Sequence, residues 1–574
     1  MFTPRSPQLT LNQADRYYLD AVGRESFYGH VAQARDRLFR DEDFAMLYCP
    51  DNGRPCVSPS LLAGALLLQA HDKVADQEAV SRANFDVRWC VALGIDLASK
   101  PFVKSTLQLF RAQLHIHGEA EAMFEASLEE AKRCGFLRGN KRTLALDTTP
   151  IFGKGAVKDT YNLIATGVVM LVRALAAVVD EEPAAWAAAH DLSRYFGTSL
   201  KGEAAINWDD REARSALLSS IVGDAQRLLQ LTRTTRGALP AGHPAQEALE
   251  QAAALLCQLL VQDIEPDAQG APQLREGVAE DRMPSAGDPE MRHGRKSKSS
   301  RFDGHKATIA VDTEEGLITA VEVIAGNAPD ATNALDLVAH SEASTGCAVD
   351  KVIGDCAYGD GATRQAFAES ERTLVAKVPA RAAGQLSKDE FDIDLDHDCV
   401  TCPGGHTVHG SVPRKREGQL ARMFCFPAAV CGACPLRAAC VKGAGGRMIT
   451  LHPQERLLQQ ARAYSQTAQF RRDIIARQTV EHRLARLVQL GIRKSRYCGR
   501  RRTQFQLAMA AAVANLTLVW NTATKRAKDR VAGACFWPSW ARAIARAGHA
   551  GGRWGLLRRF RSGHGPGFAI AAAA

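Results

Sequence analysis

Two apolar segments that lie far apart in the chain each lead into an aspartate. In "TLALD" the residues Leu144 and Leu146 alternate with Ala145 before Asp147, and in "KVIGD" an apolar run precedes Asp355. Both segments have the pattern of short buried β-strands. Ligand sites in open α/β sheets favour the carboxyl ends of strands. We therefore expect two neighbouring strands that end in Asp147 and Asp355 and hold the two carboxylates side by side.

Carboxylates held close together repel each other, and a divalent cation is the usual remedy. Mg²⁺ suits such hard oxygen ligands. The best third acid is Glu481 in "ARQTVEHRLARL", a predicted helix in which Arg477 lies four residues earlier on the same face. Considered alone, the Arg477–Glu481 pair is better explained as an ordinary ion pair within a helix, and each aspartate as a turn or strand-end residue. Taken together, they predict a magnesium site at Asp147, Asp355 and Glu481.

The order of predicted elements indicates an α/β fold. The chain has 574 residues, too many for a single core. It is helical before residue 135, supplies one strand at 141–152, and is helical again over 160–265. Strands and helices then alternate from the "KATIAVDTEEGLITAVEVIAG" hairpin to "TLVAKVP". This order predicts a mixed sheet flanked by helices, with a helical insertion after its first strand.

The expected segments follow from these changes of pattern. They are an all-α N-terminal domain at 1–135, the first strand at 136–162, a helical insertion and loop at 163–290, the second part of the sheet domain at 291–385, a small Cys-rich insertion at 386–450, C-terminal helices of the core at 451–522, and a basic tail at 523–574 expected to be poorly ordered.

Basic residues are clustered more strongly than the net charge of +9 suggests. Runs occur at 292–301, 493–502 and 553–561, and such clusters suit a polyanion such as nucleic acid. Any one run alone is equally consistent with a solvated loop. The candidates for phosphate contacts near the carboxylates are Lys154, Lys158, Arg292, Arg295, Lys296, Lys298 and Lys306. Phosphate contacts supply affinity and salt dependence but no sequence specificity.

The chain shows no sign of export or membrane insertion. Its N-terminus lacks an apolar signal-peptide region, and the most apolar run, 163–179, is interrupted by Arg173 and falls short of a membrane span. We expect a cytoplasmic, nucleoid-associated protein with no membrane partner. Its 15 cysteines are then better read as thiols and metal ligands than as disulfides.

Five cysteines gather in "CVTCPGGH" and "CGACPLRAAC". Four thiolates from two short loops suit a tetrahedral structural Zn²⁺ site. We favour the set Cys402, Cys431, Cys434 and Cys440. Cys399 is the alternative fourth ligand, His406 and His409 are weaker substitutes, and a set of reduced thiols that bind nothing remains open.

The chain resembles the DDE transposases of bacterial insertion sequences, which share an RNase H-like catalytic core. The resemblance covers roughly residues 30–521. It rests on "LALDTTPIFGKGAVKDTYNL" around Asp147, "VIGDCAYGDG" around Asp355 with Tyr358, and "ARQTVEHRLARL" with the Arg-x3-Glu spacing of Arg477 and Glu481. The segments "DPEMRHGRKSKSSRFDGHKATIAVD" and "RRRTQFQLAMAAAVANL" are also similar to the family, as is the helical "GRPCVSPSLLAGALLLQAHDKVADQEAVSRANFDVRWCVALGI".

The resemblance implies a transposase that cleaves DNA at the element ends and transfers the strand into target DNA. Asp147 would bridge two Mg²⁺ (or Mn²⁺) ions and Asp355 and Glu481 would complete one site each. It also implies DNA-end binding by the N-terminal helices, double-stranded terminal-repeat and target DNA as partners, and at least a homodimer on DNA. Similar cysteines occur at this place in related transposases.

The chain departs from one version of the family pattern at two positions. Ile474 and Val488 stand where that version has a tyrosine and a lysine. The basic role then falls to Arg486, Arg493 or Lys494, among which the sequence does not choose. Two other functions remain open, which are a metal-dependent nuclease on the same scaffold without strand transfer and an inactive DNA-binding relic.

Overall fold

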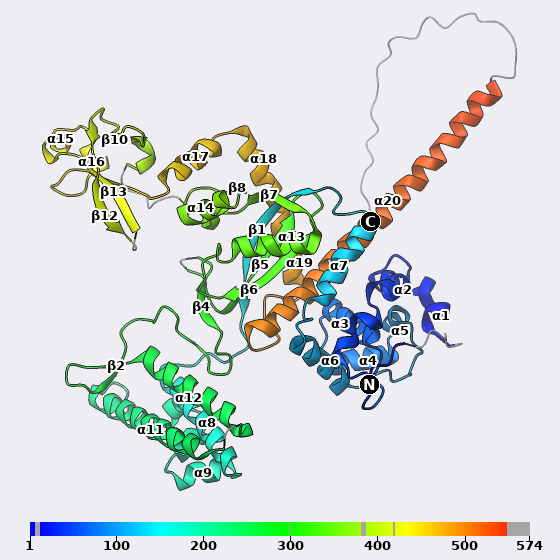
Figure 1. Cartoon of the computed structure of the whole chain (residues 1–574), viewed down its shortest axis with the longest axis horizontal. Coiled ribbons are helices and arrows are strands. Elements are labelled where there is room, and N and C mark those ends of the chain that lie inside the picture. Colours follow the sequence, from blue (N-terminus) through cyan, green and yellow to red (C-terminus); the bar gives the residue numbers. More distant parts are fainter. Residues whose placement is uncertain (6–11, 241, 298, 380–385, 417–418, 548–574) are drawn as a thin grey trace, which may run out of the picture. The chain divides into compact units, whose positions relative to one another are not determined.

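The computed structural model describes residues 1–5, 12–240, 242–297, 299–379, 386–416 and 419–547 (Figure 1). It divides into two compact units, Met1–Trp520 and Asn521–Ala574. The described part of the second unit is the remainder of helix α20 (Arg500–Ala547). The helix runs to Ala547 and so includes the first part of the predicted basic tail, 523–547. The rest of the basic tail, 548–574, lies outside the described residues.

The first unit is built on a six-stranded mixed sheet, which confirms the α/β prediction. The strands are β1 (Lys141–Phe152), β4 (Arg292–Arg295), β5 (Arg301–Asp312), β6 (Ile318–Ala325), β7 (Ala348–Ile353) and β8 (Thr373–Val375). Their order is β4-β5-β1-β7-β8, and β6 also pairs with β5. The β1–β7 and β7–β8 pairs are parallel and the others antiparallel. Strand β4 lies within the basic run 292–301.

The two faces of the sheet are apolar and each is covered by helices. Because side chains alternate along a strand, Leu144 and Leu146 face one core and Ala145 faces the other. The Leu144 face packs on α13 (Ala334–Thr345) and α14 (Gly361–Glu369). The Ala145 face shares one continuous core with the N-terminal helices, α19 (Gln478–Gln489) and the first part of α20. The sheet and these helices therefore stabilise one another.

The described elements before β1 are all helical. They are α1 (Ala14–Val22), α2 (Phe27–Leu38), a 3₁₀ helix (Asp41–Leu47), α3 (Pro59–Asp72), α4 (Asp76–Phe85), α5 (Val87–Leu93), α6 (Lys104–Ile116) and α7 (Ala122–Arg133). Helix α3 begins with the Ser58 hydroxyl accepting a hydrogen bond from Leu61 N and with Pro59 at the first position.

A helical insertion with its own apolar core separates β1 from β4 and β5. It comprises α8 (Thr160–Val178), α9 (Pro183–Ala189), a 3₁₀ helix (Ser193–Phe196), α10 (Leu200–Glu203), α11 (Arg211–Ala238) and α12 (Pro244–Asp263). A small hairpin, β2 (Ile264–Pro266) and β3 (Pro272–Leu274), follows. Helices α8 and α20 are long and apolar enough to cross a membrane, but most of each apolar stretch is buried inside the protein.

The Cys-rich segment forms two small sheets with a shared apolar core. One contains β9 (Asp392–Asp394), β10 (Cys399–Thr401) and β11 (Thr407–His409), and the other β12 (Val412–Arg416), β13 (Gln419–Cys425) and β14 (Met448–Leu451). Short helices α15 (Ala428–Gly432) and α16 (Arg437–Cys440) carry Cys431 and Cys440, and Cys434 lies between them. A buried ion pair between Lys388 and Glu455 ties this segment to α17 (Glu455–Ser465).

Side chains of helix α20 form hydrogen bonds with the backbone of β6 along the edge that pairs with no other strand. The Asn515 side chain accepts a hydrogen bond from Ile318 N at 3.0 Å and donates one to Ile318 O at 2.8 Å. Three turns earlier on the same face, Gln504 Nε2 donates to Val321 O at 2.9 Å. These amides satisfy backbone groups that a buried strand edge leaves without partners.

We predict that Asn515→Ala destabilises the protein by about 2–4 kcal/mol, because it leaves two buried backbone groups of Ile318 without partners. The midpoint of urea unfolding, followed by tryptophan fluorescence, measures the loss. Thr517→Ala, which removes one hydroxyl bond to Val513 O within the same helix, is the matched control and should shift the midpoint only slightly. Equal midpoints for the two variants would contradict the role of Asn515.

Candidate functional site

The parallel pairing of β1 and β7 sets the positions of the two aspartates. Ala145 pairs with Ile353, the last residue of β7, so Asp147 and Asp355 each lie two residues beyond this pair. Asp355 caps a 3₁₀ turn at Cys356–Tyr358, and its Oδ1 accepts a hydrogen bond from Ala357 N at 2.8 Å. The expected strand end is wrong for Asp147, because β1 continues to Phe152 along β5. Asp147 instead marks where the parallel neighbour ends.

The third acid comes from α19 (Gln478–Gln489), which packs across β1 and β5. Val480, Leu484 and Leu487 recur at helical spacing and are buried against the sheet. The single helix expected here is interrupted, since α18 (Ala468–Ala476) ends just before Arg477, the N-cap residue of α19. The Glu481 side chain, one turn into α19, remains 54% exposed.

Arg477 joins two of the three acids. Its Nη1 lies 3.0 Å from Asp147 Oδ2, and its Nη2 forms an ion pair with Glu481 Oε1. The side chains of Arg477 and Asp147 are each 19% exposed, so this contact is largely shielded from water. The family-like spacing of Arg477 and Glu481 therefore corresponds to a charged network that also reaches β1.

The electrostatics at Asp147 are unfavourable for its charged form. Burial raises the pKa of Asp147 above its ordinary value, and the charge of Asp355 raises it further. The Thr148 N–H, 2.7 Å from Oδ1, and the Arg477 guanidinium act in the opposite direction. Burial also raises the pKa of Tyr358, and the negative charges of Asp147 and Asp355 contribute. The site thus concentrates negative charge that one arginine only partly offsets.

The candidate phosphate contacts differ in availability. Arg292 and Lys306 are held in ion pairs with Asp281 and Asp330, at 2.6 Å each, and their side chains are only 14% and 12% exposed. Arg295 and Lys296 are exposed. Lys154 and Lys158 are exposed as well, and they donate to Arg496 O and Thr166 Oγ1. Lys298 lies outside the described residues.

A second basic segment lies along β1 beyond the carboxylates. Phe152 N donates to Arg493 O at 2.9 Å, and Ser495 N donates to Phe152 O at 2.8 Å. Arg493 Nη1 donates to Thr149 Oγ1 at 3.0 Å, while Lys494 is exposed. Arg486 donates to Gln489 within α19. Of the three basic candidates, Arg493 contacts the strand that carries Asp147 through its side chain, and Lys494 forms a β-bridge with Phe152 of that strand. The sequence signals these contacts only through the basic run.

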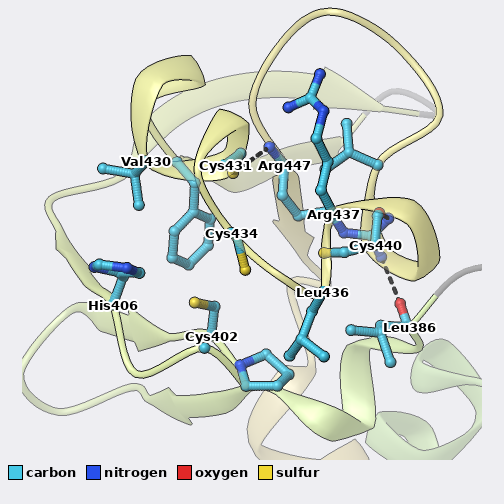
Figure 2. A pocket seen from close by; sticks show the side chains of 14 residues that line it. Leu386, Cys402, His406, Val430, Cys431, Cys434, Leu436, Arg437, Cys440 and Arg447 are labelled. Carbon is cyan, nitrogen blue, oxygen red and sulfur yellow. Dashed lines mark hydrogen bonds between the residues drawn. The ribbon is translucent and has the colours of Figure 1, made fainter.

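Four cysteines line one small pocket of about 20 Å³ in the Cys-rich segment (Figure 2). They are Cys402, Cys431, Cys434 and Cys440, and His406 also lines the space. A Cβ atom built on Gly404 would approach the sulfurs of both Cys434 and Cys402, at 3.2 and 3.6 Å, so these two thiols converge. Cys399 lies on β10 opposite His409 and is not part of the lining.

The two candidate metal sites offer different ligand atoms, and each set matches a different class of metal ion. Carboxylates beside β1 suit a hard cation, and thiols around the small space suit Zn²⁺. A volume of about 20 Å³ is of the size needed for one water-sized occupant. Among the described residues, however, no three His, Cys, Asp or Glu side chains are arranged to hold a metal ion as they stand.

We predict that Asp147→Asn stabilises the chain in EDTA at neutral pH, typically by about 0.5–2 kcal/mol for a strained functional carboxylate. A raised carboxyl pKa means that the folded state binds the proton more tightly, so charged Asp147 lowers stability at neutral pH. That penalty vanishes below pH 3.8, the ordinary pKa, and the gain from asparagine should vanish with it. Urea midpoints across this range provide the measurement.

Asp350→Asn is the control, because its side chain is 53% exposed on β7 and its nearest cation, Lys141, is 4.0 Å away. It should leave the unfolding midpoint almost unchanged. A destabilised Asp147→Asn variant at neutral pH would show that Arg477 more than compensates for the burial of Asp147.

Family models match both ends of the first unit. The Transposase DDE domain matches residues 401–520, which include Arg477 and Glu481, and the Transposase domain (DUF772) matches residues 16–113 in the N-terminal helices. No curated protein and no solved structure matches the chain. The matches agree with the family that the motifs around Asp147, Asp355 and Glu481 indicate, and they support a DDE transposase of an insertion sequence.

Proposed function

We propose that this transposase cleaves DNA at the ends of its insertion sequence and transfers the freed strand into target DNA, using Asp147, Asp355 and Glu481. The observation that carries the proposal is the β1–β7 register, which sets Asp147 level with Asp355, together with Arg477, which links Asp147 to Glu481. The strand order β6-β5-β1-β7-β8, with α19 packed across the sheet, supports an RNase H-like catalytic core.

The carboxylates would hold Mg²⁺ or Mn²⁺, with Asp147 shared and Asp355 and Glu481 completing one site each. When bound, a pair of such ions stabilises the attacking and leaving oxygens of an in-line phosphoryl transfer. Arg477 now neutralises oxygens of Asp147 and Glu481, so a cation and this guanidinium compete for the same negative charge. Arg477 would then be free to contact a DNA phosphate.

The chemistry comprises two displacements at phosphorus. Water first attacks the phosphodiester at the element end and the leaving strand departs with a 3′-hydroxyl. That hydroxyl then attacks a target phosphodiester, so one bond forms as another breaks. Neither step needs a covalent protein–DNA intermediate, and the chain's contribution is to position the scissile phosphate beside the three acids.

DNA contacts beside the acids are assigned to the basic residues that remain available. Exposed Arg295 and Lys296, with Lys154 and Lys158, are the favoured phosphate contacts, whereas Arg292 and Lys306 already neutralise internal acids. Recognition of the terminal repeats is assigned to the N-terminal helices matched by the second transposase model. Pairing of two element ends would require at least a homodimer, acting on the DNA of the cytoplasmic nucleoid.

The Cys-rich segment is proposed to hold a structural Zn²⁺ ion through Cys402, Cys431, Cys434 and Cys440. The shared small space and the convergence of Cys402 and Cys434 support this set over one that contains Cys399. The ion would fix the two small sheets that precede α17 and, through it, the helices leading to Glu481.

We predict that Asp355→Asn reduces cleavage of a duplex bearing the element end by about 100-fold or more, because it removes an oxygen ligand and a negative charge from the metal site. Cleavage with Mg²⁺ or Mn²⁺ is followed on denaturing gels. Asp350→Asn, on β7 five residues earlier, is the control and should cleave at the wild-type rate. Equal cutting by wild type and Asp355→Asn would remove Asp355 from the site.

The same gels distinguish the two alternative functions. Cleavage without joining of the 3′-end to a target plasmid would indicate a nuclease on this scaffold. DNA binding without metal-dependent cleavage by the wild type would indicate an inactive relic.

We predict one zinc ion per chain in protein purified without chelators, measured by inductively coupled plasma mass spectrometry. Cys434→Ser and Cys402→Ser should each lose most of it, because a tetrahedral site needs all four thiolates. Cys399→Ser is the matched control and should retain the zinc. Full zinc content in Cys434→Ser would contradict the proposed ligand set.

A further inference from the structure

A basic groove lies between helix α6 and the start of α20, at a place that neither the acids nor the cysteines use. It encloses about 600 Å³ and is lined on the α6 side by residues that include Gln108, His115 and Ile116. The α20 side contributes Tyr497, Arg501 and Arg502 among others. Both arginines are exposed, and the described residues provide no ion pair for either of them.

The charge in the groove is not balanced by the groups that line it. Arg111 is neutralised by Asp76 at 2.8 Å and lies 5.7 Å from the centre of the Tyr497 ring. The acid in the lining, Glu290, is already paired with Arg500 at 3.1 Å. Burial lowers the pKa of His115, and the positive charges of Arg501, Arg502 and Arg111 lower it further. The groove therefore has a positive field with no internal counter-ion for Arg501 and Arg502.

The basic segment 493–502 connects this groove to the candidate active site. It pairs with the end of β1 at Phe152, five residues from Asp147, and reaches Arg501 and Arg502 after eight or nine more residues. Five residues of strand span roughly 17 Å at about 3.3 Å per residue. That is about five base-pair steps of duplex DNA at about 3.4 Å each.

We infer that the groove between α6 and α20 binds the phosphate backbone of the same DNA duplex whose end lies at the acids, with Arg501 and Arg502 as the contacts. The inference rests on the proposed function and adds a place where the duplex is held away from the scissile bond. The guanidinium fork suits phosphate oxygens, and the path from β1 favours DNA over an acidic protein.

The test is fluorescence anisotropy of a labelled 40-base-pair duplex bearing the element end, in EDTA, as a function of salt concentration. Each phosphate contact contributes about 0.9 to the slope of log affinity against log salt. The double variant Arg501→Gln/Arg502→Gln should reduce this slope by about 1.8, on the element end and on an unrelated duplex alike.

Two matched variants separate loss of contact from loss of fold or of net charge. Arg501→Lys/Arg502→Lys keeps the charges and should retain most of the slope. Arg211→Gln/Arg233→Gln removes two exposed arginines from α11 and should leave the slope unchanged.

An unchanged slope in Arg501→Gln/Arg502→Gln, with tight and salt-dependent binding by the wild type, would overturn this inference and leave the proposed function intact. Loss of self-association at an unchanged slope would assign the groove to contact between copies of the chain and also overturn it. Failure of the wild type to bind any duplex would overturn both proposals together.

Discussion

The parallel pairing of β1 with β7 is the constraint on which the site depends. It sets two carboxylates level with each other just beyond the last paired residues, Ala145 and Ile353. The two neighbouring carboxylates concentrate negative charge, which requires a counter-charge close by. Helix α19 crosses the sheet, and Arg477 at its start supplies the counter-charge that Asp147 otherwise lacks. The chain thereby keeps a largely buried acid ionisable at the cost of a strained electrostatic environment.

Much of this arrangement could be predicted from the sequence. Alternating apolar residues locate β1 and the β5–β6 hairpin, and the run before Asp355 locates β7, because period-two patterning and turn residues are local signals. Helical spacing likewise identifies the buried face of α19. The extent of the strand at 141–152 could be predicted, but its pairing could not: β7 ends near Asp147, whereas pairing with β5 continues over residues 304–312. Such pairing is a property of the tertiary fold.

Other parts of the site could not be read from local patterns. The ion pairs that occupy Arg292 and Lys306 join residues 11 and 24 positions apart, and nothing in a basic run distinguishes a buried cation from an exposed one. The contact of Arg493 with Thr149 joins residues 344 positions apart. The hydrogen bonds of the Gln504 and Asn515 side-chain amides could not be predicted either, because their partners lie on a strand about 190 residues earlier. Motif resemblance marks these segments without revealing what they touch.

The helical insertion between β1 and β5 has a consequence for how the chain reaches this structure. During synthesis β1 emerges about 150 residues before its antiparallel partner, and joining two strands across a flexible loop carries an entropic cost that rises with the logarithm of loop length. The insertion has a core of its own, with α8 and α12 packed together near its two ends. Once the insertion has folded, the packing of α8 on α12 holds its two ends close together, so that β1 and β5 are joined by a short effective connection. A segment outside the sheet would thus influence how quickly the six-stranded sheet assembles.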